Sequence, residues 1–315
     1  MIYAWGAMIS SRTSKTRSDP LSELLARVTL GGARCTRLEA AGAWGLRFPE
    51  RTRLKFVALL RGACWIALPD APARQLRTGD TFLLANSGYV IGSAPDVEAQ
   101  DGAALFDAAE TAVVRLGGDE TALLGGSFVF EGGNERLAID AMPPAMFIPA
   151  DLPAAAVLRE TLGILDRELA QSLMGATLMT QRLADIMLVQ ALRAYVSEYG
   201  AGAAGWLGAL SDRQIGDALR RMHRDVAHGW TVGELASAAA MSRSAFALRF
   251  KTKVGVAPLE YLRNWRMQLA SDALGRSDCS VADLAATLGY ASESAFGNAF
   301  KRNFGRSPKQ NPPAN

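Results

Sequence analysis

One internal repeat constrains the fold of this chain more than any other feature of its sequence. The segment 231–236 (TVGELA) returns 49 residues later as 280–285 (SVADLA). After a one-residue slip, the offset becomes 50, and the matched pairs are Ser242 with Ser292, Phe246 with Phe296, Phe250 with Phe300, Gly255 with Gly305 and Pro258 with Pro308. Because a repeat of this length forms one supersecondary unit, residues 212–315 are predicted to contain two copies of one motif.

Each copy carries the signals of two short helices joined by a tight turn. Thr231 and Ser280 each precede a carboxylate by three positions, which is typical of a capped helix start. A second helix is predicted to begin after Ser242 in the first copy and after Ser292 in the second. On it, two phenylalanines four positions apart lie on one face and are expected to pack against the first helix. The predicted unit is a helix-turn-helix.

The opposite face of each second helix suits the major groove of DNA, which is ~12 Å wide. It carries Ser244, Ala247, Leu248 and Lys251 in the first copy, and Glu293, Ser294, Gly297, Asn298 and Lys301 in the second, flanked by Arg243, Arg249 and Arg302. Asn298 can pair with adenine, Glu293 can accept from cytosine, and Ser294 can bond either base type. We therefore expect the second copy to supply most base-specific hydrogen bonds.

The spacing of the two copies and their charge also favour a DNA partner. A continuous helix is predicted over Leu259 to Leu274, with Leu262, Trp265 and Leu269 directed inward. It would hold the two second helices about one duplex turn, ~34 Å, apart. From residue 206 onward the chain has 15 Lys and Arg against 9 Asp and Glu, whereas the preceding part has 19 against 22. Lys251, Arg302 and Lys309 are expected to contact phosphates. An all-α bundle that binds protein, or nothing, is the alternative.

The N-terminal part has a different pattern. Short apolar runs at Leu54–Leu60, Cys64–Leu68, Thr81–Ala85 and Ser127–Phe130 predict strands of an antiparallel sandwich or small barrel. A leucine stripe at Leu158, Leu162, Leu165 and Leu169 predicts an amphipathic helix. A second helix is expected over 177–198, with an apolar side formed by Leu183, Ile186, Met187 and Val189. The fold class is α+β, with a disordered leader over 1–18, a sensor domain over 19–150, a helical dimerisation region over 151–199, a flexible linker over 200–211 and the helical module over 212–315.

The helical module resembles the AraC/XylS family of bacterial transcription regulators. The resemblance is carried by Trp230 to Val232, Leu235-Ala236, Met241-Ser242, Ser280 to Asp283, Leu288 to Tyr290, Phe296, Phe300 to Arg302, Phe304-Gly305 and Ser307-Pro308. It implies a cytoplasmic regulator, for example an activator, that binds double-stranded promoter DNA and contacts RNA polymerase. The strand-rich part, with 44–49 (WGLRFP) and Gly79-Asp80, is similar to the cupin-type sensor of one branch. A homodimer is expected through the leucine stripe.

An enzymatic alternative is a metal-dependent cupin. Such sites need several imidazoles around the metal, but the only histidines are His223 and His228, both in the helical module. Val57 and Tyr89 stand where a metal cupin would place imidazole, and no HExxH, GxSxG or GxxxxGK[ST] motif is present. We therefore expect no catalytic residue, no metal and no cofactor.

Two kinds of signal remain open for the sensor domain, as does a constitutive DNA binder that responds to neither. A small-molecule effector is expected to lie among the aromatic residues of the strand-rich part, namely Trp44, Phe48, Phe56, Trp65, Phe82 and Tyr89. The alternative is thiol oxidation at Cys35 or Cys64, which requires an exposed thiolate of low pKa. The widely spaced cysteines favour a reducing compartment, and the longest apolar runs are too short to span a membrane. No signal peptide is expected.

Overall fold

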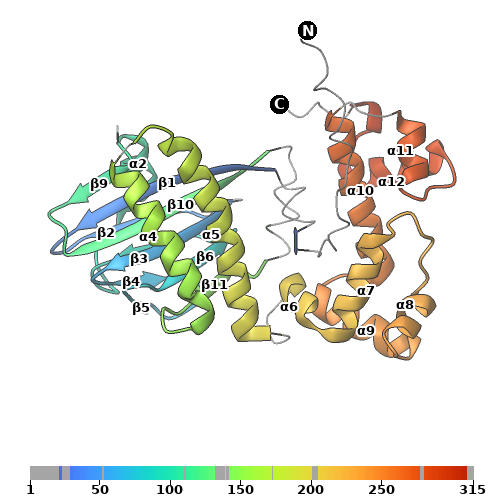
Figure 1. Cartoon of the computed structure of the whole chain (residues 1–315), viewed down its shortest axis with the longest axis horizontal. Helices are drawn as coiled ribbons and strands as arrows, with labels where there is room; N and C mark the ends of the chain where they lie inside the picture. The colour runs from blue at the N-terminus through green and yellow to red at the C-terminus, as the bar shows by residue number, and fades with distance from the viewer. Residues whose placement is uncertain are drawn as a thin grey trace, which may run out of the picture.

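The computed structural model describes residues 21–22, 29–51, 53–109, 111–131, 139, 142–171, 173–200, 205–276 and 280–310. Figure 1 shows two parts: two sheets of strands with two helices packed on them, and a bundle of helices. The predicted leader over 1–18 lies outside the described residues.

The N-terminal part contains two sheets. The first has the order β11-β6-β3-β10-β1-β9 and the second β5-β4-β7-β2-β8. Their strands are β1 (Thr29–Ala40), β2 (Gly45–Phe48), β3 (Leu54–Arg61), β4 (Ala63–Ala67), β5 (Arg74–Arg77), β6 (Thr81–Ala85), β7 (Tyr89–Gly92), β8 (Gln100–Asp101), β9 (Val113–Leu116), β10 (Thr121–Glu131) and β11 (Ala145–Ile148). Three predicted strands are confirmed within β3, β6 and β10, and the fourth, Cys64–Leu68, is confirmed as β4 except for Leu68, which lies one residue beyond its end.

The two sheets do not close into a barrel, and two of their strand pairs are parallel, β1 with β9 and β2 with β8. Both β8 and β9 lie at the edge of their sheets, and the helix α2 (Gly102–Asp107) connects them. Of the two predicted architectures, the antiparallel barrel is therefore wrong, and the domain is a sandwich of two sheets. Strand-length apolar runs identify strands but carry no information on which edges pair.

Alternation along β3 divides the apolar residues into two cores. Val57 and Leu59 face the second sheet, with Leu46 and Ile91 opposite them. Phe56 and its neighbours in phase lie on the other face of the first sheet, which two helices cover (Figure 1). These are α4 (Ala156–Gln171), which follows the short 3₁₀ helix η1 (Pro153–Ala155), and α5 (Ala176–Tyr199).

The leucine stripe of α4 packs inside the domain. Leu158, Leu162 and Leu165 are at most 3% exposed, and Leu169 packs against the same core. The stripe therefore cannot form the predicted dimer interface, because it already covers the chain's own first sheet. On α5 the predicted apolar side is partly wrong as well, since Met187 is buried but Ile186 is 48% exposed.

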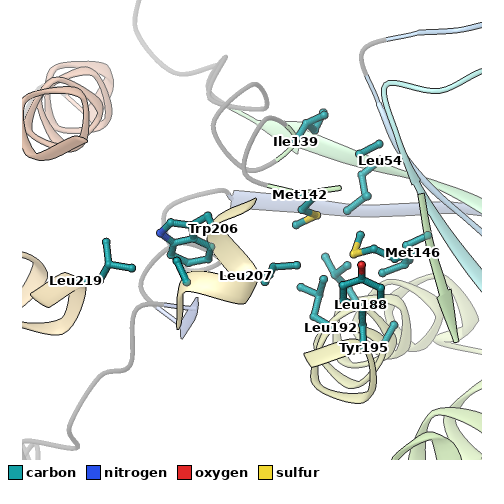
Figure 2. Close-up of a cluster of buried hydrophobic side chains, with 14 of the residues drawn as sticks. Leu54, Ile139, Met142, Met146, Leu188, Leu192, Tyr195, Trp206, Leu207 and Leu219 are labelled. Carbon is teal, nitrogen blue, oxygen red and sulfur yellow. The ribbon is translucent and has the colours of Figure 1, made fainter. Parts of the chain in front are cut away.

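The predicted flexible linker over 200–211 is corrected at its C-terminal end. Residues Gly205–Ser211 form a helix, α6, in which Trp206 and Leu207 are buried. Figure 2 shows Leu207 directed toward Leu192 of α5, while Trp206 lies on the side of α6 that faces Leu219. The repeated Gly and Ala suggested a coil, but Trp206 and Leu207 gain enough burial to order a short helix.

Among the described residues of the C-terminal part, all regular secondary structure is helical, as predicted. It contains α7 (Arg213–Arg224), α8 (Val232–Ala238), α9 (Arg243–Val254), α10 (Pro258–Arg276), α11 (Val281–Thr287), α12 (Glu293–Phe304) and the short 3₁₀ helix η3 (Pro308–Gln310). The helix pair α8–α9 forms the first unit and the pair α11–α12 the second, and α10 runs between them (Figure 1). The predicted inward residues of α10 are confirmed, because Leu262, Trp265 and Leu269 are all buried.

Candidate nucleic-acid interface and sensor cavity

The first helix of each unit begins at the predicted cap. The Thr231 hydroxyl accepts from the Glu234 amide and the Glu234 carboxylate accepts from the Thr231 amide, so a full capping box is present. Ser280 accepts from the Asp283 amide only, which is the weaker form expected for aspartate. These caps fix where α8 and α11 start, and with them the position of the turn that follows.

The two turns have the same backbone hydrogen bonds. The Met241 amide donates to the Ala236 carbonyl, and the Tyr290 amide donates to the Ala285 carbonyl, each over 2.9 Å. Both turns pass through the left-handed region, at Ala240 with φ 52° and at Gly289 with φ 76°. This is a Schellman motif, which ends the first helix and redirects the chain into the second.

The second helix of each unit is fastened by its phenylalanines. Phe246, Phe250, Phe296 and Phe300 are all 0% exposed, and the hydroxyls of the preceding serines cap both helices. The buried face fixes the rotation of α9 and α12, and the predicted groove-facing residues then point outward. Leu248 is 71% exposed, and Ser244, Lys251, Ser294 and Asn298 are also exposed, while Ala247 and Gly297 are partly buried.

The exposed side of α12 carries polar side chains that are available to bind a ligand. Within the described part of the chain, no hydrogen bond or ion pair engages the side chains of Glu293, Asn298 or Arg302, nor that of Lys251 on α9. Polar side chains with that freedom can exchange water for base edges or phosphates at low cost. The outer face of α12 therefore has the chemistry of a major-groove reader.

Arg249 is used differently from the prediction. Its guanidinium donates to the Asp212 carboxylate over 2.8 Å and to the Gln214 side chain over 2.9 Å, which binds α9 to the start of α7. Burial alone would raise the pKa of Asp212, but hydrogen bonds from the Ile215 amide, from Arg249 and from the Gln214 amide outweigh it and lower that pKa. Arg249 therefore positions the first unit rather than standing free for phosphate.

A polar clamp, which was not predicted, joins the segment between α7 and α8 to the second unit. The Arg266 guanidinium, on α10, donates to the carbonyls of Val226 and His228, each over 2.8 Å, and lies over the Tyr290 ring. At the same place the Gly289 Cα packs against the backbone of Ala227 so closely that a β-carbon would lie 2.1 Å from its carbonyl oxygen. The clamp fixes the second unit against the segment that leads into the first unit.

A cavity of about 560 Å³ lies between the two sheets. Of the six aromatic residues predicted to line it, only Phe48 and Tyr89 do so. Phe56 lies on the opposite face of the first sheet, against Phe128. Trp65 alternates with the buried Cys64 and Ile66, so it lies outside the core between the two sheets. Trp44 and Phe82 belong to that core but do not line the cavity.

The cavity has an apolar floor and a basic mouth. Leu46, Val57, Ile91 and Leu123 form the floor. Four cationic residues line the remaining wall, Arg34, Arg51, Arg53 and Lys55. None of these was predicted, although the alternation of β3 offered a signal, because Lys55 is in phase with the inward Val57 and Leu59.

Neither predicted thiol is suited to oxidation. Cys35 and Cys64 are 7% and 1% exposed, and they lie in different cores. Burial raises the pKa of each thiol to about 12, and for Cys64 the charge of Asp80 adds to the effect. A redox sensor requires the opposite, an accessible thiol with a lowered pKa, so the geometry favours the cavity over the thiol alternative.

Both histidines have structural surroundings. His223 is buried, stacks on Trp265 and lies 2.7 Å from the Tyr261 hydroxyl, which also accepts from the Trp206 indole. His228 lies beside Glu234 at the start of α8. The described residues contain no group of three or more His, Cys, Asp or Glu arranged to hold a metal, and none of their helices is long and apolar enough to cross a membrane.

Comparison with known proteins matches both parts of the chain. The sequence profile of a cupin family covers residues 19–197, including the helices α4 and α5, and a helix-turn-helix domain profile covers 235–311. Two tandem helix-turn-helix units beside a cupin-type domain define a one-component DNA-binding regulator. The chain is 39% identical, over 92% of its length, to a putative AraC-like transcription regulator of Streptomyces antibioticus and to one of Streptomyces lividans, covering 97% and 96% of those proteins.

The chain belongs to the AraC-like transcription regulators. Its relatives are regulators and not enzymes, which contradicts the alternative of a metal-dependent cupin enzyme. Among solved structures it resembles the DNA-binding domain of AdpA in complex with a target DNA, with 33% identity over 30% of this chain and 85% of that chain and a TM-score of 0.29.

Proposed function

We propose that this regulator binds promoter DNA through α9 and α12 and that a small molecule in the sheet cavity controls this binding. The observation that carries the proposal is the cavity itself, since an interior of about 560 Å³ is in the range of small-molecule sites. The protein then acts where the DNA is, in the cytoplasm. Contact with RNA polymerase is part of the proposal.

Helix α6 offers a route from the sensor to the reader. Leu207 packs toward α5 (Figure 2). The Trp206 indole donates to the Tyr261 hydroxyl of α10 over 2.9 Å. A change in how α5 packs on the first sheet would therefore be felt at the helix that separates the two readers. The test is promoter affinity of Trp206→Phe, which keeps the ring but loses the donor: we expect DNA binding to remain and its response to a cavity ligand to weaken.

Asn298 and Lys251 are expected to contribute to DNA binding in different ways. Asn298→Ala should cost ~1–3 kcal/mol of binding free energy and relax preference at one base pair, as loss of a bidentate adenine contact would. Lys251→Ala should lower affinity about equally for all sequences, because a phosphate contact carries no base information. Binding-site selection with the full chain measures both effects.

Ser244 is the control for this assignment, because it is the one hydrogen-bonding residue among the predicted groove-facing positions of α9 other than Lys251. If Asn298→Ala leaves the preferred sequence unchanged while Ser244→Ala alters it, the roles of the two units are reversed. Retention of full affinity by both variants at high salt would remove both helices from the interface.

A homodimer is also proposed, through a surface that differs from the predicted stripe. The outer faces of α4 and α5 and their connection expose apolar side chains, namely Val157, Ile164, Leu173, Met174, Leu178, Met179 and Ile186. An apolar patch of that kind is typical of a protein interface. Ile186→Glu should shift the mass in light scattering from dimer to monomer, whereas Leu259→Glu, an equally exposed leucine on α10, should not. A monomeric wild-type chain at tens of micromolar overturns the proposal.

A further inference from the structure

We infer that the sheet cavity binds an organic carboxylate with an apolar body. The inference deepens the proposed effector site by naming the chemistry of its ligand. It rests on the distribution of charge along the cavity wall, on the surroundings of Lys55 and on a glycine that leaves the cavity open.

The cavity wall is apolar at its deep end and cationic at its outer end, which suits an amphipathic anion. Its deep part is closed by aliphatic side chains that are at most 4% exposed, including Leu46, Val57 and Leu123. This deep part alone would suit a neutral apolar molecule. The wall nearer to solvent, however, carries four cationic side chains and one carboxylate, that of Asp107. Asp107 is engaged by Arg34 over 3.0 Å, so among the described residues of this wall three cations have no counterion.

Lys55 is the cation placed deepest. Its side chain points between the sheets, in phase with Val57, and its ammonium lies 5.1 Å from the Phe48 ring centre and 5.2 Å from that of Tyr89. In the parts of the chain that the structure describes, no carboxylate lies within ion-pairing distance of this ammonium. Aromatic faces attract a cation but do not neutralise it, and a buried charge without a counterion is costly. A ligand carboxylate would supply the missing partner.

The surroundings of Lys55 make its charge sensitive to pH. Burial, with the charges of Arg51 and Arg53 adding to it, lowers the pKa of Lys55 to about 8. The groups that face it are these two arginines, Arg34 with Asp107, and the Tyr89 hydroxyl, whose pKa burial raises. Lys55 is therefore cationic at neutral pH and loses its charge above about pH 8, so carboxylate affinity should fall as the pH rises through that value.

Gly125 on β10 keeps the cavity open. It lines the cavity, and a β-carbon added there would meet only the Phe56 carbonyl at 3.7 Å and the Thr36 hydroxyl at 3.9 Å, which is ordinary contact. Its neighbour Gly126 differs, because a β-carbon there would meet the Phe56 ring at 2.3 Å. A larger residue at 125 should therefore fill the cavity without disturbing the first sheet.

The test is calorimetric titration of the full chain with decanoate and with 2-naphthoate, each beside its neutral amide. We expect at least one acid to bind saturably, and about tenfold more tightly than its amide. Lys55→Met should remove about tenfold of the acid's affinity and leave the amide unchanged, while Arg77→Met, an exposed arginine outside the cavity, should change neither. Gly125→Leu should abolish binding, with an unchanged circular dichroism spectrum and melting temperature as the check on folding.

Three results overturn the inference: neither acid binds, the amides bind as tightly as the acids, or a folded Gly125→Leu variant binds both acids normally. Affinity at about pH 9.5 should be lower than at about pH 6.5 in the wild type and nearly equal in Lys55→Met. Promoter affinity measured with and without the bound acid tests the proposed function separately. An acid that binds in the cavity but leaves DNA affinity unchanged contradicts effector control by this ligand and leaves the carboxylate site standing.

Discussion

Replacing Gly289 by alanine is expected to destabilise the second helix-turn-helix unit by roughly 2–4 kcal/mol. Two effects add. Gly289 has φ 76°, a left-handed conformation that costs an L-residue roughly 1–2 kcal/mol. The new β-carbon would also lie 2.1 Å from the Ala227 carbonyl oxygen, so backbone has to move. Since that contact fixes the second unit against the segment that leads into the first unit, promoter affinity should fall together with the urea midpoint.

The first unit provides the matched control for this variant. Ala240 occupies the equivalent turn position with φ 52°, and it is exposed. Ala240→Gly relieves the strained backbone conformation and should stabilise the chain by up to about 1 kcal/mol, because the gain is offset by the extra freedom of glycine in the unfolded state. If Gly289→Ala unfolds at the wild-type midpoint and binds promoter DNA normally, the contact with Ala227 does not exist in solution.

The helical module could be predicted from the sequence in detail because its determinants are local. The caps at Thr231 and Ser280, the paired phenylalanines and the spacer helix all depend on residues within a few positions of one another, and each was confirmed. The ion pair of Arg249 could not be predicted in the same way, because its partner is not local. From the sequence, a cationic residue on an exposed helix is predicted to bind phosphate. The fold brings a carboxylate 37 positions earlier, Asp212, beside it.

The sensor cavity was harder to predict because its wall is assembled from distant strands. Aromatic residues were expected to line it, but β-strand alternation decides which side of a sheet each residue occupies, and it placed Phe56 under α4 and α5. The same alternation directs Lys55 inward from the same strand. Which face is covered by helices and which by the second sheet depends on strand pairing, and that information is not present in any single segment.

Asp212→Ala is the second substitution with a large expected effect, a loss of roughly 2–4 kcal/mol from the helical module. Asp212 is 2% exposed and caps α7, accepting from the amides of Gln214 and Ile215 over 3.0 and 3.1 Å. Its other oxygen accepts from Arg249. The alanine variant leaves two amides without a partner and frees α9 from α7, and urea unfolding followed by circular dichroism measures the loss.

Asp212→Asn separates the two contributions, because its amide oxygen can still cap α7 while the ion pair with Arg249 is lost. We expect a smaller loss, about 1 kcal/mol, since the Arg249 side chain is 45% exposed and water screens the pair. The two variants should also differ from wild type in acid. The pKa of Asp212 is lower in the folded chain, so its stabilisation is present above the ordinary aspartate pKa and is lost as the pH falls through the folded value. Both variants lack this carboxylate and should lose less stability than wild type as the pH is lowered through that range, whereas an equal loss in all three proteins would show that the Asp212 contacts do not form.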